Sequence, residues 1–128
     1  MCADLIEHQA LAAELDGTAV GLRDRNELEA AVARPFQTAG GNPLFLGPAE
    51  KAAALADSVI RRQPFVDGNK RVAAMAAARV MDLFGLDLIA HPLELADVIR
   101  DLDSGRLSEG EVADWLDDHC LPLEDKER

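Results

Sequence analysis

Apolar residues recur every three or four positions along most of this 128-residue chain, and proline or glycine interrupts them at intervals typical of helix ends. The first apolar run predicts a helix over Asp4–Leu15. Asp24, followed three residues later by Glu27, forms a capping-box-like pair that predicts the start of a second helix. The proline and glycine pairs of residues 34–48 then predict a long loop.

Two longer apolar runs follow this loop. The first begins at Pro48, a residue suited to the first turn of a helix, and stops at Pro64. The second is apolar almost all the way round its axis from Val72 to Ala78 and ends at Gly85. We therefore expect a central helix that is buried on most sides.

The last third of the chain predicts two more helices. His91 precedes a proline that opens one of them, and Ser108 with Glu111 is a capping-box start for the other. The sequence therefore predicts one all-α domain over residues 1–128, a bundle of about six helices with a frayed tail at 122–128.

The amino-acid composition agrees with an all-α fold and limits the classes of binding partner that the chain can have. Tyrosine is absent and one Trp occurs, so strand formers are scarce, and the formal charge of −11 disfavours nucleic acid as the main partner. No apolar stretch approaches a membrane span, and the first ten residues lack the basic start of a signal peptide. Cys2 and Cys120 form no zinc-binding or disulfide pattern, which favours a reduced, cytoplasmic protein.

The segment RRQPFVDGNKR, which ends at Arg71, is the least regular part of the helical pattern and contains the candidate functional residues. If Asp67 caps the buried helix, the backbone amides that follow have no partner within the helix and can bind an anion. Gly68 lets the backbone approach a phosphate closely, and Asn69 can fix the loop by hydrogen bonds to the backbone. Lys70 and Arg71 lie where the helix macrodipole disfavours cations by about 0.3–1 kcal/mol each, which indicates an anion facing them.

Two further roles are expected at this turn. Phe65 should anchor it on the core, and Asp67 is a candidate Mg²⁺ ligand beside phosphate oxygens. Spacing alone leaves a structural alternative open, in which the turn simply starts a helix and its two cations are solvated.

QPFVDGNKR closely resembles the signature loop of the Fic/Doc family, whose pattern is His-x-Phe-x-Asp/Glu-Gly-Asn-x-Arg at the start of a central helix. GLRDRNELEAAVARPFQTAGG before it and HPLELADVIRDLDSGRLSEGEVADWL after it are similar to the Doc branch, the death-on-curing toxins of bacterial toxin–antitoxin pairs that serve prophage maintenance. The resemblance implies the small all-α Fic/Doc bundle.

Two positions decide which chemistry the resemblance implies. AMP-transferring Fic enzymes typically have Gly where this chain has Lys70, whereas Doc proteins have Lys there and transfer the γ-phosphoryl group of ATP to elongation factor Tu. Gln63 stands in place of the catalytic histidine, and its amide has no basicity near neutral pH. The resemblance therefore implies a Doc-type kinase impaired by the loss of general-base catalysis, which costs roughly 10²–10⁴-fold.

The same resemblance assigns roles to individual residues. It implies Gln63, Asp67 and Arg71 as the catalytic positions, with Asp67 as the Mg²⁺ ligand. The cofactors implied are ATP and Mg²⁺, and the implied cradle for the ATP phosphates is Gly68, Asn69, Lys70 and Arg71.

Residues 36–46 are expected, by resemblance, to form a flap over the site that aligns the target segment. Phe45 and Leu46 would supply its apolar contacts. The alternative is that these two side chains plug the core beneath the loop.

No other histidine is tied to the turn by its sequence position. His8, His91 and His119 are expected to cap helices or to lie on the surface, and Trp115 is expected to be a core residue of the last helix.

Restraint of the activity is expected from a partner. Glu109-Gly110 matches half of the self-inhibitory pattern of some Fic proteins, but Gly105 stands where that pattern has Ser or Thr. The resemblance therefore implies a Phd-like antitoxin that acts in trans.

Two other functions stay open. A degenerate bundle that only binds an antitoxin or regulator would keep the fold without catalysis, and AMP transfer is disfavoured by Lys70. A third explanation for Gln63 also stays open: it is a substitution introduced to inactivate a toxic enzyme.

Overall fold

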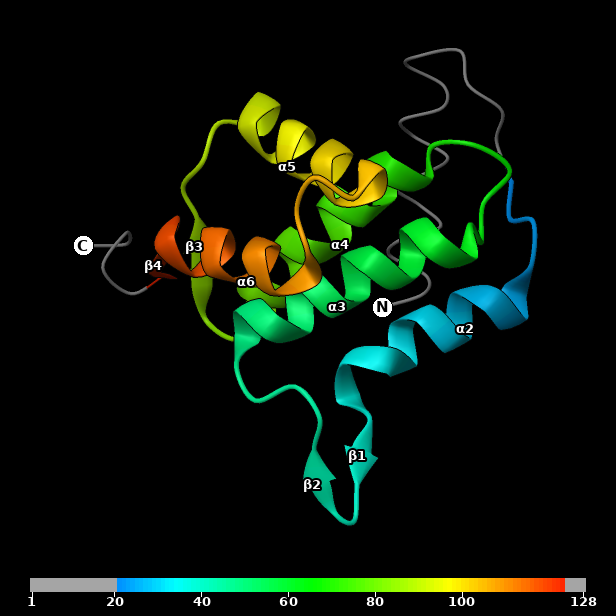
Figure 1. The fold of residues 1–128 in the computed structure, drawn as a ribbon, viewed down its shortest axis with the longest axis horizontal. Helices are drawn as coiled ribbons and strands as arrows, with labels where there is room; N and C mark the ends of the chain where they lie inside the picture. Colours follow the sequence, from blue (N-terminus) through cyan, green and yellow to red (C-terminus); the bar gives the residue numbers. More distant parts are fainter. Residues whose placement is uncertain (1–20, 124–128) are drawn as a thin grey trace.

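The computed structural model describes residues 21–123, which form a helical bundle with two small antiparallel sheets (Figure 1). The helices are α2 (Arg25–Ala33), the 3₁₀ helix η1 (Arg34–Phe36), α3 (Pro48–Arg62), α4 (Asn69–Leu83), α5 (Pro92–Ser104) and α6 (Glu109–Asp118). The strands are β1 (Thr38–Ala39), β2 (Asn42–Pro43), β3 (Leu86–Leu88) and β4 (Cys120–Pro122). The all-α prediction is confirmed, and the predicted helix Asp4–Leu15 lies outside the described residues.

Helices α3 and α4 lie side by side at the centre, and α2, η1 and α6 pack on α3 (Figure 1). Alanine dominates the buried face of α3, which lets the neighbouring helices approach closely. The sequence predicted that α4 is buried on most sides, and six of its residues are buried, although Ala74, Met75 and Ala78 are only partly buried. The core is therefore built around the α3–α4 pair rather than around α4 alone.

The predicted starts of α2 and α6 are confirmed by their caps. Asp24 Oδ1 accepts hydrogen bonds from the amides of Asn26 (2.9 Å) and Glu27 (3.3 Å) at the start of α2. Ser108 and Glu111 form a complete capping box at α6, in which each side chain accepts from the other residue's backbone amide. These local bonds fix where the helices begin.

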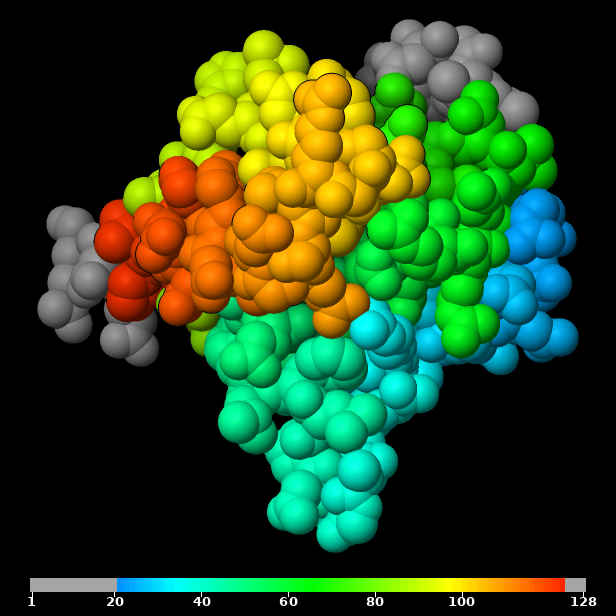
Figure 2. Space-filling view, viewed as in Figure 1, coloured from blue at the N-terminus to red at the C-terminus, as the bar shows by residue number. Residues whose placement is uncertain are grey.

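The sequence did not predict the two small sheets. One lies in the predicted loop, and the other holds part of the predicted frayed tail. The loop predicted over residues 34–48 contains η1 and a β1–β2 hairpin that stands out from the helical body (Figure 2). Pro122 pairs with Leu86 between β4 and β3, and the Leu123 amide donates to Gly85 O at 2.9 Å. The predicted fraying is therefore wrong for residues 122 and 123, because backbone pairing holds them.

None of the described helices is both long enough and apolar enough to cross a membrane.

Candidate functional site

The turn between α3 and α4 contains the predicted site, and it begins with an unusual backbone conformation. Gln63 caps the carboxyl end of α3 with φ 47° and ψ 60°, in the left-handed region. A residue with a Cβ atom adopts this conformation at a cost of about 1–2 kcal/mol, which glycine would avoid. The position therefore keeps a side chain despite the strain, as residues at functional sites often do.

Arg23 clamps the start of the turn from the residues that precede α2. Its Nε donates to Gln63 O at 2.6 Å, and its Nη2 donates to Arg62 O at 2.7 Å. Its backbone amide donates to Pro64 O at 2.7 Å. A cation at the carboxyl end of α3 satisfies carbonyls that lack intrahelical partners and complements the helix dipole. Sequence reasoning gave Arg23 no role.

Phe65 and Asn69 hold the middle of the turn, as the sequence predicted. The Phe65 side chain is 1% exposed and belongs to the core. Asn69 Oδ1 accepts from Phe65 N, and Asn69 Nδ2 donates to Phe65 O, both at 3.0 Å. One amide side chain thus satisfies both backbone polar groups of a buried residue.

The start of α4 differs from the predicted start by one residue. The N-cap is Gly68, with φ 76°, rather than Asp67. Glycine takes this left-handed conformation without strain, and Asp67 Oδ1 accepts from the Gly68 amide at 2.7 Å. The first intrahelical bond runs from Val72 N to Gly68 O at 3.0 Å. The amides of residues 69–71 therefore precede the first intrahelical bond of α4, whereas the Gly68 amide, which the sequence had also made a candidate anion donor, is bonded to Asp67.

A cavity of about 420 Å³ lies over this helix start. It brings together every residue that the sequence assigned to the turn's catalytic and phosphate-binding roles, and it adds Asp103 from α5. Its lining consists of Ile60, Gln63, Val66, Asp67, Gly68, Asn69, Lys70, Arg71 and Asp103. Lys70 Nζ lies 3.6 Å from Asp103 Oδ2, so a carboxylate that the sequence analysis missed reaches the candidate phosphate site.

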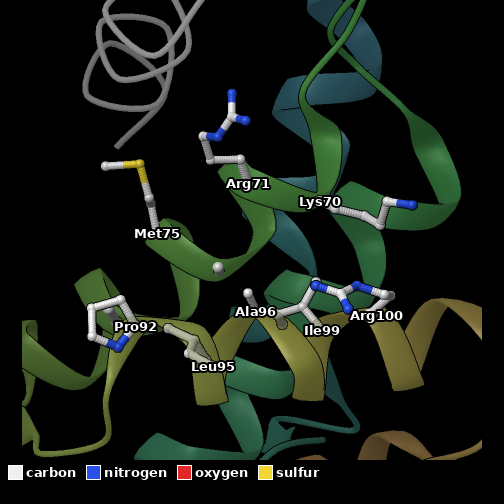
Figure 3. Close-up of a pocket in the computed structure, with 10 residues that line it drawn as sticks. Lys70, Arg71, Met75, Pro92, Leu95, Ala96, Ile99 and Arg100 are labelled. Atoms are coloured by element: carbon white, nitrogen blue, oxygen red, sulfur yellow. The ribbon is translucent and has the colours of Figure 1, made fainter. Parts of the chain in front are cut away.

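A second, more apolar groove of about 460 Å³ runs between α4 and α5 (Figure 3). Its walls include Met75, Leu95 and Ile99. Lys70 and Arg71 line this groove as well as the cavity at the turn, and their side chains leave α4 in different directions (Figure 3).

Phe45 and Leu46 lie away from the turn. They follow the β1–β2 hairpin at the amino end of α3, whereas the turn follows its carboxyl end (Figure 1). A helix of this length spans about 22 Å. Leu46 is 76% exposed, and the Phe45 ring lies under the Arg34 guanidinium at 5.2 Å. The structure thus does not bring the predicted flap contacts over the cavity.

The two described histidines do not line the cavity at the turn. His91 is the N-cap of α5, and its Nδ1 accepts from the Leu93 amide at 3.0 Å, as predicted for a capping residue. The His119 ring stacks on Trp115 with centroids 4.3 Å apart, and Trp115 packs against the core. His8 lies outside the described residues. Neither described histidine is placed to serve as a base beside Gln63.

Comparison with known proteins agrees with this geometry. The family model described as the Fic/DOC family matches residues 3–81, which include the turn and most of α4. The chain belongs to the Fic/DOC family. Toxin Doc of Mycolicibacterium smegmatis is 42% identical to it over 74 residues.

This match covers 58% of the chain and 57% of Toxin Doc, so it spans little more than half of each protein. The predicted Fic/Doc membership and the similarity to the Doc branch are confirmed. Helix α5, which supplies Asp103, follows the family match.

Proposed function

We propose that this Fic/DOC chain is a Doc-like toxin component that binds ATP with Mg²⁺ at the α3–α4 turn and transfers the γ-phosphoryl group slowly to a protein hydroxyl. One observation carries the proposal. The residues that open α4, including Lys70 and Arg71, line one cavity together with Asp67 and Gln63.

The residues of the cavity divide the work by their chemistry. Backbone amides at the start of α4 and the Lys70 ammonium bind phosphate oxygens, and Arg71 offers a guanidinium to the charge that develops during transfer. Gly68 presents no side chain toward the phosphates. The apolar groove beside Lys70 and Arg71 is the proposed place for the nucleoside.

The donor set fits Mg²⁺ bound together with phosphate. No group of three His, Cys, Asp or Glu side chains within residues 21–123 could hold a metal ion by itself. Mg²⁺ commonly takes one or two carboxylates plus phosphate oxygens and water, and Asp67 supplies such a carboxylate in the cavity. When bound, Mg²⁺ would neutralise charge on the triphosphate.

Gln63 is the reason that we propose a slow rate of phosphoryl transfer. The hydroxyl oxygen of the target bonds to the γ-phosphorus, the bond to the β–γ bridging oxygen breaks, and the hydroxyl proton must leave. Gln63 has no basic atom to accept this proton, so the proton passes to solvent water. Positioning and charge stabilisation remain, so we expect activity reduced by roughly 10²–10⁴-fold rather than abolished.

The finer biological assignments follow from the family. Elongation factor Tu is the proposed target and a Phd-like antitoxin the proposed restraint, both in the cytoplasm. Similarity of the turn to Doc, including Lys70, supports the kinase assignment over AMP transfer.

The test compares the wild-type chain with Gln63→His in a phosphorylation assay with purified elongation factor Tu, Mg²⁺ and γ-labelled ATP. We expect weak labelling by the wild type and labelling about 10²-fold or more faster by Gln63→His. Asp67→Asn in the Gln63→His background is the matched inactive control. If neither folded protein labels the factor, the kinase proposal fails, and label from α-labelled ATP would instead establish AMP transfer.

A binding module without catalysis is the second candidate, and Gln63 is the observation that favours it. Calorimetric titration with ATP and Mg²⁺ separates the two, because a module that only engages an antitoxin gives no heat of nucleotide binding.

A further inference from the structure

Asp103 introduces a negative charge into a site proposed to bind phosphates. Its Oδ2 lies 3.6 Å from Lys70 Nζ and its Oδ1 lies 4.0 Å from Arg61 Nη1. It lines the same cavity as Gln63 and Asp67 but comes from the carboxyl end of α5. An acid at this end of a helix is disfavoured by the macrodipole, and no basic residue of the last turn compensates it.

The position of Asp103 is fixed by contacts to α3. Arg61 Nη2 donates to Leu102 O at 3.1 Å, and Arg61 Nη1 donates to Asp103 O at 3.4 Å. Arg61 is itself held by Asp57, whose Oδ1 lies 3.2 Å from Arg61 Nε. The last turn of α5 is therefore tied to the last turn of α3, and the Asp103 carboxylate is presented to the cavity by this tie.

We propose that Asp103 is a built-in competitor that pairs with Lys70 and lowers the affinity of the turn for polyphosphate anions. This inference rests on the proposed function and adds a control of ligand affinity to it. A phosphate that binds Lys70 must replace the Asp103 carboxylate, and it is repelled by that carboxylate while it remains nearby. The pair is exchangeable because both side chains are substantially solvated, with 58% of Lys70 and 40% of Asp103 exposed.

The direct test measures binding of Mg²⁺–ATP, and of tripolyphosphate without metal, by calorimetry. We expect Asp103→Asn to bind both ligands about 3–10-fold more tightly than the wild type at low salt. The gain should shrink at about 0.5 M salt, because ions screen exposed charges. Thermal melting of each variant confirms that it is folded.

Asp101→Asn is the matched control. Asp101 lies on α5, forms an ion pair with Arg106 at 3.9 Å and loses the same charge, but neither Asp101 nor Arg106 lines the cavity at the turn or the apolar groove. Its affinity for either ligand should stay within about twofold of the wild type. An equal gain in both variants would show a general charge effect and overturn the specific role of Asp103.

Lys70→Ala tests whether Asp103 acts through Lys70. In that background, Asp103→Asn should improve affinity by a clearly smaller factor than in the wild type, since the pair is already broken and only the direct repulsion by Asp103 remains to be removed. If the wild type binds the ligands and Asp103→Asn binds them equally or more weakly, the competitor role of Asp103 is overturned. The proposed nucleotide site is not affected by that result. If the wild type, Asp103→Asn and Lys70→Ala all fail to bind either ligand, the proposed nucleotide site is overturned, and the competitor role of Asp103 falls with it.

Discussion

Replacement of Asn69 by alanine tests whether one side chain holds the functional turn. Asn69 makes two hydrogen bonds of 3.0 Å to the backbone of Phe65, whose side chain is 1% exposed. Each such bond contributes about 0.5–1.5 kcal/mol, and loss of the partner leaves a buried donor and a buried acceptor unpaired at further cost. We therefore expect Asn69→Ala to lower the free energy of unfolding by about 2–3 kcal/mol.

Urea unfolding followed by far-ultraviolet circular dichroism measures this change, and thermal melting should show a decrease of about 6–15 °C. Asn26→Ala is the matched control, because Asn26 is an exposed residue in the first turn of α2. Its free energy of unfolding should stay within about 0.5 kcal/mol of the wild type.

Asn69→Asp separates stability from binding. Aspartate keeps the acceptor for Phe65 N but loses the donor to Phe65 O, and an acid is favoured in the first turn of a helix. We expect a smaller loss of stability than in Asn69→Ala together with weaker binding of ATP, since the new charge repels phosphate. If Asn69→Ala is as stable as the wild type within about 0.5 kcal/mol, the turn is not held by this side chain.

Three further predictions concern the charges, a helix cap and the thiol. Lys70→Ala and Arg71→Ala should each weaken ATP binding in calorimetry. The melting temperature should stay unchanged or rise slightly, because each substitution removes a cation that the α4 dipole disfavours. Marked destabilisation by both would indicate structural ion pairs instead. His91→Ala should lower the free energy of unfolding by about 1 kcal/mol in urea, whereas His91→Asn restores the α5 cap; equal stability of the two would exclude the capping role. Burial, with a nearby carboxylate adding to it, raises the pKa of the Cys120 thiol. Its alkylation in the folded protein should therefore rise at a higher pH than in urea, as measured by peptide mapping, and coincident pH profiles would contradict this.

The sequence predicted what short-range chemistry determines. The caps at Asp24 and Ser108 depend on residues within three positions, and the structure contains both. At the turn, the sequence predicted that Phe65 anchors on the core and that Asn69 bonds to the nearby backbone, and the structure contains both. The error of one residue at the start of α4 arose because glycine, rather than aspartate, took the conformation that reverses the chain.

The hairpin and the β3–β4 pairing were missed for a different reason. Each strand has two or three residues, too few for an alternating pattern to be recognised. Strands β3 and β4 pair with each other although α5 and α6 lie between them in the sequence, so the pairing depends on how those two helices pack. The position of Phe45 and Leu46 away from the turn likewise follows from the direction of α3, which the sequence does not give.

Two side chains that shape the site come from remote parts of the chain, and this limits what local motifs can show. Arg23 lies 40 residues before Gln63, whose carbonyl it binds, and Asp103 reaches Lys70 from the far end of α5. Neither contact has a periodic signature, because each depends on a helix end that another helix positions. In the proposed function, the motif residues determine which ligand chemistry the turn offers, while Arg23 adds rigidity and Asp103 adds charge. A chain with the same turn but without a carboxylate at position 103 should thus share the chemistry of this one and differ in its affinity for anions.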